Sequence, residues 1–128
     1  RLATCSEKGT QIKVFSNPNS QLLFTFRRGS FPAHIYSLAL SLKGELIAAA
    51  SDSGTVHLFR AADGSSSSET KSFARINIKE KVKTQVVLEP SCGTISIFQF
   101  PPPGEAMTLA QYAIEKNTAK LTGEYPLQ

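Results

Sequence analysis

Residues 47–59 read IAAASDSGTVHLF, and residues 2–15 read LATCSEKGTQIKVF. Both stretches begin with small and apolar residues, pass through a serine, an acidic residue and Gly-Thr, and end in an apolar run that closes on phenylalanine. A weaker third copy, CGTISIF, occupies residues 92–98. The chain is therefore built from a repeat, and the spacing of that repeat is the first guide to the fold.

The spacing is typical of a β-propeller. Ser6 and Ser51 lie 45 positions apart, and Gly54 and Gly93 lie 39 positions apart. Propeller blades of the WD-repeat type recur every ~40–45 residues. One blade is a four-stranded antiparallel sheet that cannot bury both of its faces alone, so blades stack around an axis. We predict an all-β chain of propeller blades, about two complete and one partial. Closed propellers have about 4–8 blades, so this chain alone is expected to be only part of a propeller. Because the sequence starts inside a blade, we expect the missing blades on the N-terminal side.

The local patterns predict strands that fit this architecture. Apolar and β-branched residues are typical of strands in eight segments: 11–15, 22–26, 35–40, 46–50, 55–59, 73–78, 82–88 and 94–100. Alternation in 73–78 indicates an outer, half-exposed strand. Residues 106–116 fit a short helix and a further strand, 109–114, equally well. Residues 61–71 include four consecutive serines and are too polar to bury, so we expect a mobile loop.

Composition narrows the function classes. The formal net charge is +4 and the pI is about 9.2, which favours acidic partners such as anionic lipid or nucleic acid without choosing between them. The most apolar stretch, around 35–50, is broken by polar and charged residues and does not predict a membrane span. Cys5 and Cys92 form no disulfide framework and no metal-ligand pattern, so we expect small strand residues in a reducing, intracellular setting.

Arg27 and Arg28 are the residues whose chemistry stands out. They follow the predicted strand 22–26, and adjacent residues at a strand end point to opposite sides, so they could serve two separate anion sites. Guanidinium groups match phosphate oxygens in bidentate fashion. An Arg-Arg pair taken alone is most often solvated or salt-bridged surface.

The repeat adds neutral hydrogen-bond donors on both sides of this pair. Hydroxyls and turn amides are the donors that a phosphate site needs beside an arginine. They are Ser6 and Thr10 before the pair, and Ser51 and Thr55 after it. Lys13 and His57 occupy similar places beyond the two threonines, and His57 donates more strongly when protonated. For each serine or threonine taken singly, a turn or strand hydroxyl is as good an interpretation.

Three segments together resemble the PROPPIN family, which are autophagy-related β-propellers that bind polyphosphoinositides. They are FRRG at 26–29, IYSLA at 35–39 and SDSGTVHLF at 51–59. The resemblance is good over about residues 2–78 and looser beyond. It implies a seven-bladed propeller, of which this chain supplies the rest of blade 5 (1–29), blade 6 (30–78, with the mobile loop 61–71) and blade 7 (79–128).

The resemblance also implies two lipid sites on the rim of the propeller. The first would use Ser6, Thr10 and Arg27, and the second would use Arg28, Ser51, Thr55 and His57. The ligands would be phosphatidylinositol 3-phosphate and phosphatidylinositol 3,5-bisphosphate. The implied role is a scaffold in autophagy, cytoplasmic and peripheral on autophagosomal precursor, endosomal or vacuolar and lysosomal membranes. Its partners would be the lipid-transfer or conjugation machinery, together with the missing N-terminal blades.

Two segments depart from the family pattern. Residues 30–34, SFPAH, are more apolar than is usual there, and Phe31 either touches the bilayer or caps the blade, with the cap slightly favoured. The segment that matches the family's membrane-dipping loop, 61–71, has no bulky apolar residue, which argues against deep insertion.

Other functions fit the sequence less well. A generic protein-interaction propeller, whose arginine pair binds an acidic peptide, is the main alternative, since a fold alone never fixes a function. We expect no enzyme, because His34 and His57 have no partnered nucleophile and there is no phosphate-cradling glycine loop. Aromatic residues are not interleaved with basic ones, so nucleic acid is not the expected ligand. No metal or cofactor is expected.

Overall fold

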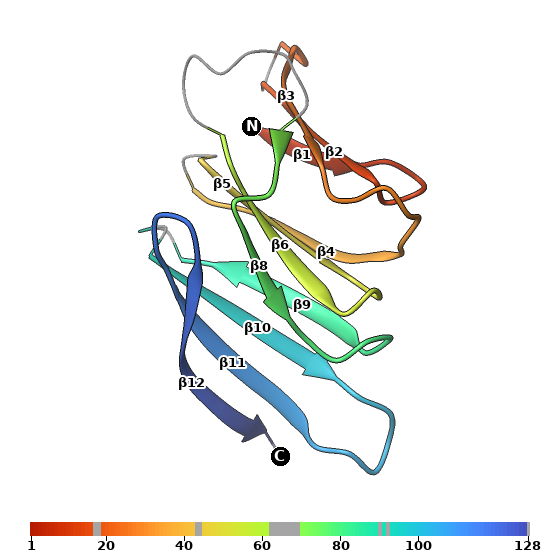
Figure 1. Cartoon of the computed structure of the whole chain (residues 1–128), viewed down its shortest axis with the longest axis vertical. Helices are drawn as coiled ribbons and strands as arrows, with labels where there is room; N and C mark the ends of the chain where they lie inside the picture. The colour runs from red at the N-terminus through yellow and green to blue at the C-terminus, as the bar shows by residue number, and fades with distance from the viewer. Residues whose placement is uncertain (17–18, 43–44, 62–69, 90, 92, 128) are drawn as a thin grey trace.

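The secondary structure is entirely β (Figure 1). The computed structural model describes residues 1–16, 19–42, 45–61, 70–89, 91 and 93–127. Within these ranges there are 12 strands in three four-stranded sheets, and no helix. It follows that none of these residues belongs to a helix that could cross a membrane. The all-β prediction is confirmed.

Apart from one short strand, the three sheets follow one another along the chain, from the N-terminal sheet at the top of Figure 1 to the C-terminal sheet at the bottom. The first has the order β1 (Leu2–Cys5), β2 (Gln11–Phe15), β3 (Leu22–Arg27) and β7 (Thr70–Lys71). The second has the order β4 (Ile35–Leu40), β5 (Leu46–Ser51), β6 (Thr55–Arg60) and β8 (Ala74–Asn77). The third has the order β12 (Ala119–Leu127), β11 (Met107–Ile114), β10 (Thr94–Phe100) and β9 (Lys83–Leu88). Neighbouring strands are antiparallel except β3 and β7, which are parallel.

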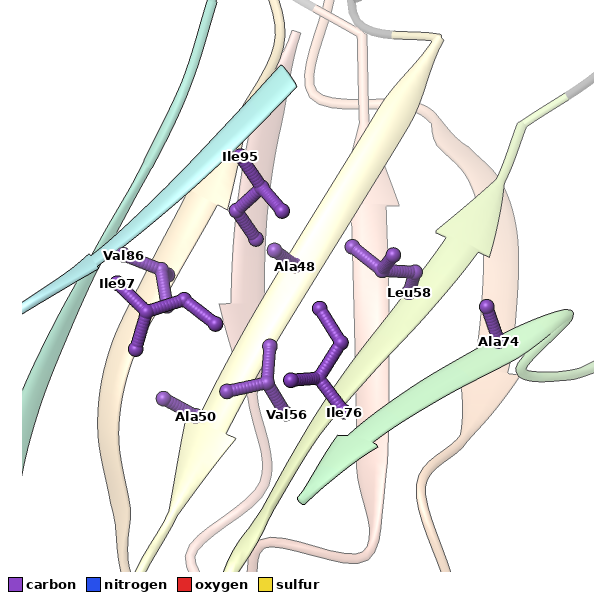
Figure 2. Close-up of a cluster of buried hydrophobic side chains, with 9 residues drawn as sticks. All are labelled: Ala48, Ala50, Val56, Leu58, Ala74, Ile76, Val86, Ile95 and Ile97. Atoms are coloured by element: carbon purple, nitrogen blue, oxygen red, sulfur yellow. The ribbon is translucent and has the colours of Figure 1, made fainter. Parts of the chain in front are cut away.

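The middle sheet is packed on both faces, and its sequence shows why. Every residue of β5 is buried, and residues 47–50 belong alternately to the two opposite clusters. Ala48 and Ala50 face the third sheet, while Ile47 and Ala49 face the first. Figure 2 shows the cluster on the side of the third sheet, whose members are Ala48, Ala50, Val56, Leu58, Ala74, Ile76, Val86, Ile95 and Ile97. Because successive side chains of a strand point to opposite faces, small residues in the central strand let both neighbouring sheets approach closely.

The Gly-Thr element of the repeat forms the turns that begin β2 and β6. Gly9 has φ +71° and Gly54 has φ +86°, in the left-handed region that favours glycine. A Cβ atom at Gly9 would collide with the carbonyl oxygen of Ala33. Gly9 is therefore needed where the β3–β4 connection lies against the β1–β2 turn, and this contact positions the candidate site.

Most predicted strands are confirmed, with ends shifted by a residue or two, and residues 107–114 form a strand rather than a helix. The C-terminal strand β12 was not predicted. Most of the predicted mobile loop, namely 62–69, lies outside the described residues, as does Cys92. The loop prediction is wrong at its ends. Ala61 is buried in the cluster that faces the first sheet, and Thr70–Lys71 form β7 because the outer edge of β3 offers backbone partners. The division into blades at 29/30 and 78/79 stays a prediction.

Candidate functional site

A cationic pocket opens where the first two sheets meet. It has a volume of about 240 Å³ and is lined by Arg27, Arg28, Gly29, Ser30, Lys71, Ser72 and Arg75. The residues come from the end of β3, the connection that follows it, β7, the β7–β8 connection and β8. The parallel pairing of β7 with β3 places Lys71 opposite Arg27, and β8 carries Arg75 outward on its exposed face. Two sheets therefore contribute to one pocket.

The lining of this cationic pocket is chemically one-sided. The lining contains three guanidinium groups, one ammonium group and the hydroxyls of Ser30 and Ser72. No acidic side chain is among the lining residues. Guanidinium and ammonium groups beside hydroxyl donors are suited to phosphate oxygens. The arrangement can bind a multiply charged anion.

Arg28 has a structural role as well as a place in the pocket. Its Nε donates to the carbonyl oxygen of Gly9, and its Nη2 donates to the carbonyl oxygen of Phe31. Burial lowers the pKa of the Arg28 guanidinium, and the negative charge of Asp52 acts in the opposite direction. Arg27 donates through Nη1 to the carbonyl oxygen of Gly29 at 3.4 Å. From the sequence we expect the two arginines to serve separate sites, but in this structure both line the same pocket.

His57 lies behind the pocket and is uncharged at neutral pH. It is only 6% exposed, and its Nδ1 lies 3.2 Å from the Oγ of Ser72. Burial, together with the positive charges of Arg28 and Arg75, lowers the pKa of His57 to about 4, and burial is the largest of these causes. The imidazole therefore holds the Ser72 hydroxyl in place and adds no positive charge of its own.

Ser51 and Thr55 do not line the cationic pocket. Ser51 is 0% exposed, and its Oγ lies 2.6 Å from the Oγ of Ser53. Thr55 is half-buried at the start of β6, opposite Asn77 of β8. Of the residues predicted for the second lipid site, the structure thus brings together Arg28 and, through Ser72, His57.

Ser6 lies in a separate hollow. This hollow has a volume of about 230 Å³ and is lined by Thr4, Cys5, Ser6, Gln11 and Lys13. The Oγ of Ser6 accepts a hydrogen bond from the backbone N–H of Gln11 at 3.1 Å. Arg27 and Thr10 are not among the lining residues, so the trio predicted for the first lipid site is not gathered in one hollow. The binding roles of these residues stay predictions.

Lys71, Ser72 and Arg75 line the pocket but were not predicted from the sequence as site residues. Alternation in 73–78 does predict that Arg75 faces outward, but no pattern places it beside Arg27. Lys71 belongs to the segment expected to be a loop, and its position depends on the pairing of β7 with β3. The slightly favoured interpretation of Phe31 as a cap is wrong, because its side chain is 82% exposed.

Within the described part of the chain, neither Cys5 nor any acidic cluster suggests other chemistry. Cys5 is an exposed free cysteine. Across the described ranges, no group of three or more histidine, cysteine, aspartate or glutamate residues is placed to hold a metal ion. The cationic pocket is accordingly the strongest candidate site.

Comparison with known proteins identifies the family. The family model named PROPPIN matches residues 1–78. The chain belongs to the PROPPIN family. Among curated PROPPIN relatives, the chain is similar to "Autophagy-related protein 18" of Yarrowia lipolytica, with 50% identity over 66 residues, which are 52% of this chain and 16% of that protein. It is similar to the protein of the same name from Aspergillus terreus, with 33% identity over 122 residues, which are 95% of this chain and 28% of that protein.

Solved structures confirm the propeller prediction. Kluyveromyces lactis Hsv2 superposes with a TM-score of 0.79 at 23% identity, over 96% of this chain and 42% of that one. KlAtg21, in its complex with the coiled coil of AgAtg16, superposes with a TM-score of 0.77 at 26% identity, over 98% of this chain and 38% of that one. The three sheets are propeller blades of the PROPPIN type. The chain spans less than a third of the length of each of these two curated relatives.

Proposed function

We propose that this chain is the membrane-binding part of a phosphoinositide-binding propeller. The observation that carries the proposal is the cationic pocket, in which Arg27, Arg28, Lys71 and Arg75 line one cavity of about 240 Å³. A phosphorylated inositol ring presents several phosphate oxygens within a small volume. A pocket with cations from two sheets and a hydroxyl held by His57 suits such a head group better than a single carboxylate.

The proposed ligands are phosphatidylinositol 3-phosphate and phosphatidylinositol 3,5-bisphosphate. The hollow that contains Ser6 and Lys13 is proposed as an additional lipid site, and its single cation makes it weaker than the cationic pocket. Two modest sites engaged on one membrane gain avidity, because the second contact forms at a high effective concentration.

We also propose the cellular role of a scaffold in autophagy. The support is the name of the curated relatives, "Autophagy-related protein 18", and the solved complex of KlAtg21 with the coiled coil of AgAtg16. The protein would be peripheral on autophagosomal precursor, endosomal or vacuolar membranes. It would meet proteins of the lipid-transfer or conjugation machinery, and N-terminal blades would complete the propeller.

Vesicle flotation of the full-length protein tests the lipid proposal. Vesicles of phosphatidylcholine would be compared with and without phosphatidylinositol 3-phosphate. We expect the substitutions Arg27→Gln and Arg75→Gln together to weaken binding at least tenfold, since a hydrogen bond to a charged group contributes about 1.5–3 kcal/mol. Arg28 is left intact because it also holds the loop backbone.

The matched control removes the same charge elsewhere. Lys83 and Lys120 are exposed on the third sheet, away from the cationic pocket. We expect Lys83→Gln with Lys120→Gln to change binding by less than about twofold, because surface charges act weakly at physiological salt. Equal losses of affinity in both variants would mean that binding depends on the overall positive charge of the protein and not on the cationic pocket. Binding that ignores the phosphoinositide would favour the protein-interaction alternative.

A further inference from the structure

The connection between β3 and β4 carries an aromatic side chain that the fold does not use. Phe31 is 82% exposed and belongs to neither buried cluster. In Figure 1 the connection, drawn in orange, curves out at the edge of the molecule between β3 and β4. Single exposed apolar side chains are common on protein surfaces. Whether the exposed ring of Phe31 indicates a binding function therefore depends on how its backbone is held and on which residues surround it.

The backbone around Phe31 is held in place. The guanidinium of Arg28 binds the carbonyl oxygen of Phe31 itself. Pro32, which follows, has a fixed φ. Further hydrogen bonds fasten the rest of the connection: Ala33 N to Lys8 O at 2.9 Å, His34 N to Asp52 Oδ1 at 3.0 Å, and Asp52 N to His34 O at 2.9 Å. The phenyl ring thus projects from a fastened loop, and the same arginine fastens it and lines the cationic pocket.

The surroundings of Phe31 favour a lipid bilayer as the partner. Ser30, its immediate neighbour, lines the cationic pocket. A stable protein interface needs a surface of roughly 1,000 Å², whereas Phe31 is the one large apolar side chain among the exposed described residues of the β3–β4 connection. Leu42, a large apolar side chain of comparable exposure (81%), follows β4 at its opposite end. One protruding ring beside a cluster of cations fits the membrane interface, where cations meet phosphates and aromatic rings enter the boundary with the acyl chains.

We propose that Phe31 enters the interface of a phosphoinositide-containing bilayer as an apolar anchor, while the adjacent cationic pocket holds the lipid head group. This inference rests on the proposed function. It differs from head-group recognition because the anchor acts only when the head group belongs to a membrane. Removing the ring should cost about tenfold in vesicle affinity, the scale set by burying part of a phenylalanine side chain.

The test compares two ligands and two variants of the full-length protein. Phe31→Ser is paired with Leu42→Ser, which removes an equally exposed apolar side chain at the other end of β4. We expect Phe31→Ser to lose about tenfold in affinity for vesicles of phosphatidylcholine with phosphatidylinositol 3-phosphate. We expect both variants to bind soluble inositol 1,3-bisphosphate as the parent protein does. Leu42→Ser should bind vesicles normally.

The outcomes separate the two proposals. If Phe31→Ser binds vesicles as tightly as the parent, the anchor is refuted while head-group binding stands. If the parent binds neither the vesicles nor the soluble head group, the proposed function fails and the anchor fails with it. If Leu42→Ser loses as much as Phe31→Ser, the effect is general surface hydrophobicity, which also refutes the anchor.

A spectroscopic probe reports the position of the ring directly. These 128 residues contain no tryptophan, so Phe31→Trp adds a reporter whose signal is the difference from the parent protein. We expect a blue shift on binding phosphoinositide vesicles, and quenching by lipids brominated near the head-group boundary. An unshifted, unquenched signal in protein that has bound the vesicles would overturn the proposal.

Discussion

The charge state of His57 makes stability depend on pH in a way that can be measured. His57 is buried behind Ser72, and burial together with the charges of Arg28 and Arg75 lowers its pKa from 6.5 to about 4. In the unfolded chain the imidazole returns to its ordinary pKa. Between these two pKa values the unfolded state binds more protons than the folded state. The stability that the neutral His57 contributes is therefore fully present above pH 6.5 and is lost as the pH falls towards 4.

The size of this loss follows from the shift. Each pKa unit corresponds to about 1.4 kcal/mol, so a shift of roughly two and a half units gives about 3 kcal/mol when the pH is below both values. At pH 5, where the folded imidazole is still mostly neutral, the loss relative to pH 7.5 is about 2 kcal/mol. Such a loss is a large fraction of the total stability of an ordinary domain.

Urea unfolding of the full-length protein and of His57→Asn, each at pH 7.5, 6 and 5, measures this term. Asparagine keeps a polar atom near the position of Nδ1, which faces Ser72, but it does not titrate. Contributions from all other groups cancel in the difference between the two proteins. We expect the advantage of the parent protein to shrink by about 2 kcal/mol between pH 7.5 and 5. A difference that stays constant within about 0.5 kcal/mol would refute a neutral, buried His57.

Three further predictions follow from the same geometry. Gly54→Ala should destabilise the protein by about 1–2 kcal/mol, because Gly54 has φ +86° and a Cβ atom there would come within 2.7 Å of Glu80. As the control, Gly29→Ala should change the urea midpoint little, because a Cβ atom at Gly29 meets open space. Ser72→Ala should weaken binding of soluble inositol 1,3-bisphosphate several-fold in calorimetry, since it removes the hydroxyl that His57 holds; unchanged affinity would remove Ser72 from the site. Raising the salt concentration from about 0.1 to 0.5 M should weaken vesicle binding several-fold through screening, and a salt-independent affinity would contradict a pocket lined by cations.

Much of the fold was predictable because each copy of the repeat contains the same turn followed by the same kind of apolar strand. Glycine before threonine marks a turn with positive φ, and the apolar run after it must form a strand that buries one face. The alanines of β5 mark a strand packed on both faces. Strand β7 was not predictable, because two polar residues form a strand there only through the unpaired edge of β3, which is distant in sequence.

The candidate site was predictable only in part, for a similar reason. The Arg27-Arg28 pair is visible as a local signal, and it lies in the cationic pocket. Its partners Lys71 and Arg75 come from a segment more than 40 positions away, and their place depends on how two sheets meet. The charge state of His57 depends on burial and on neighbouring guanidiniums, which no local pattern reveals.

The most direct test of the central claim is a crystal structure of the full-length protein with soluble inositol 1,3-bisphosphate. We expect phosphate oxygens within hydrogen-bonding distance of Arg27, Arg75 and the hydroxyl of Ser72, with Arg28 still bound to the carbonyl oxygens of Gly9 and Phe31. A head group bound at a distance from Arg27 and Arg75, with the cationic pocket left to solvent, would contradict it.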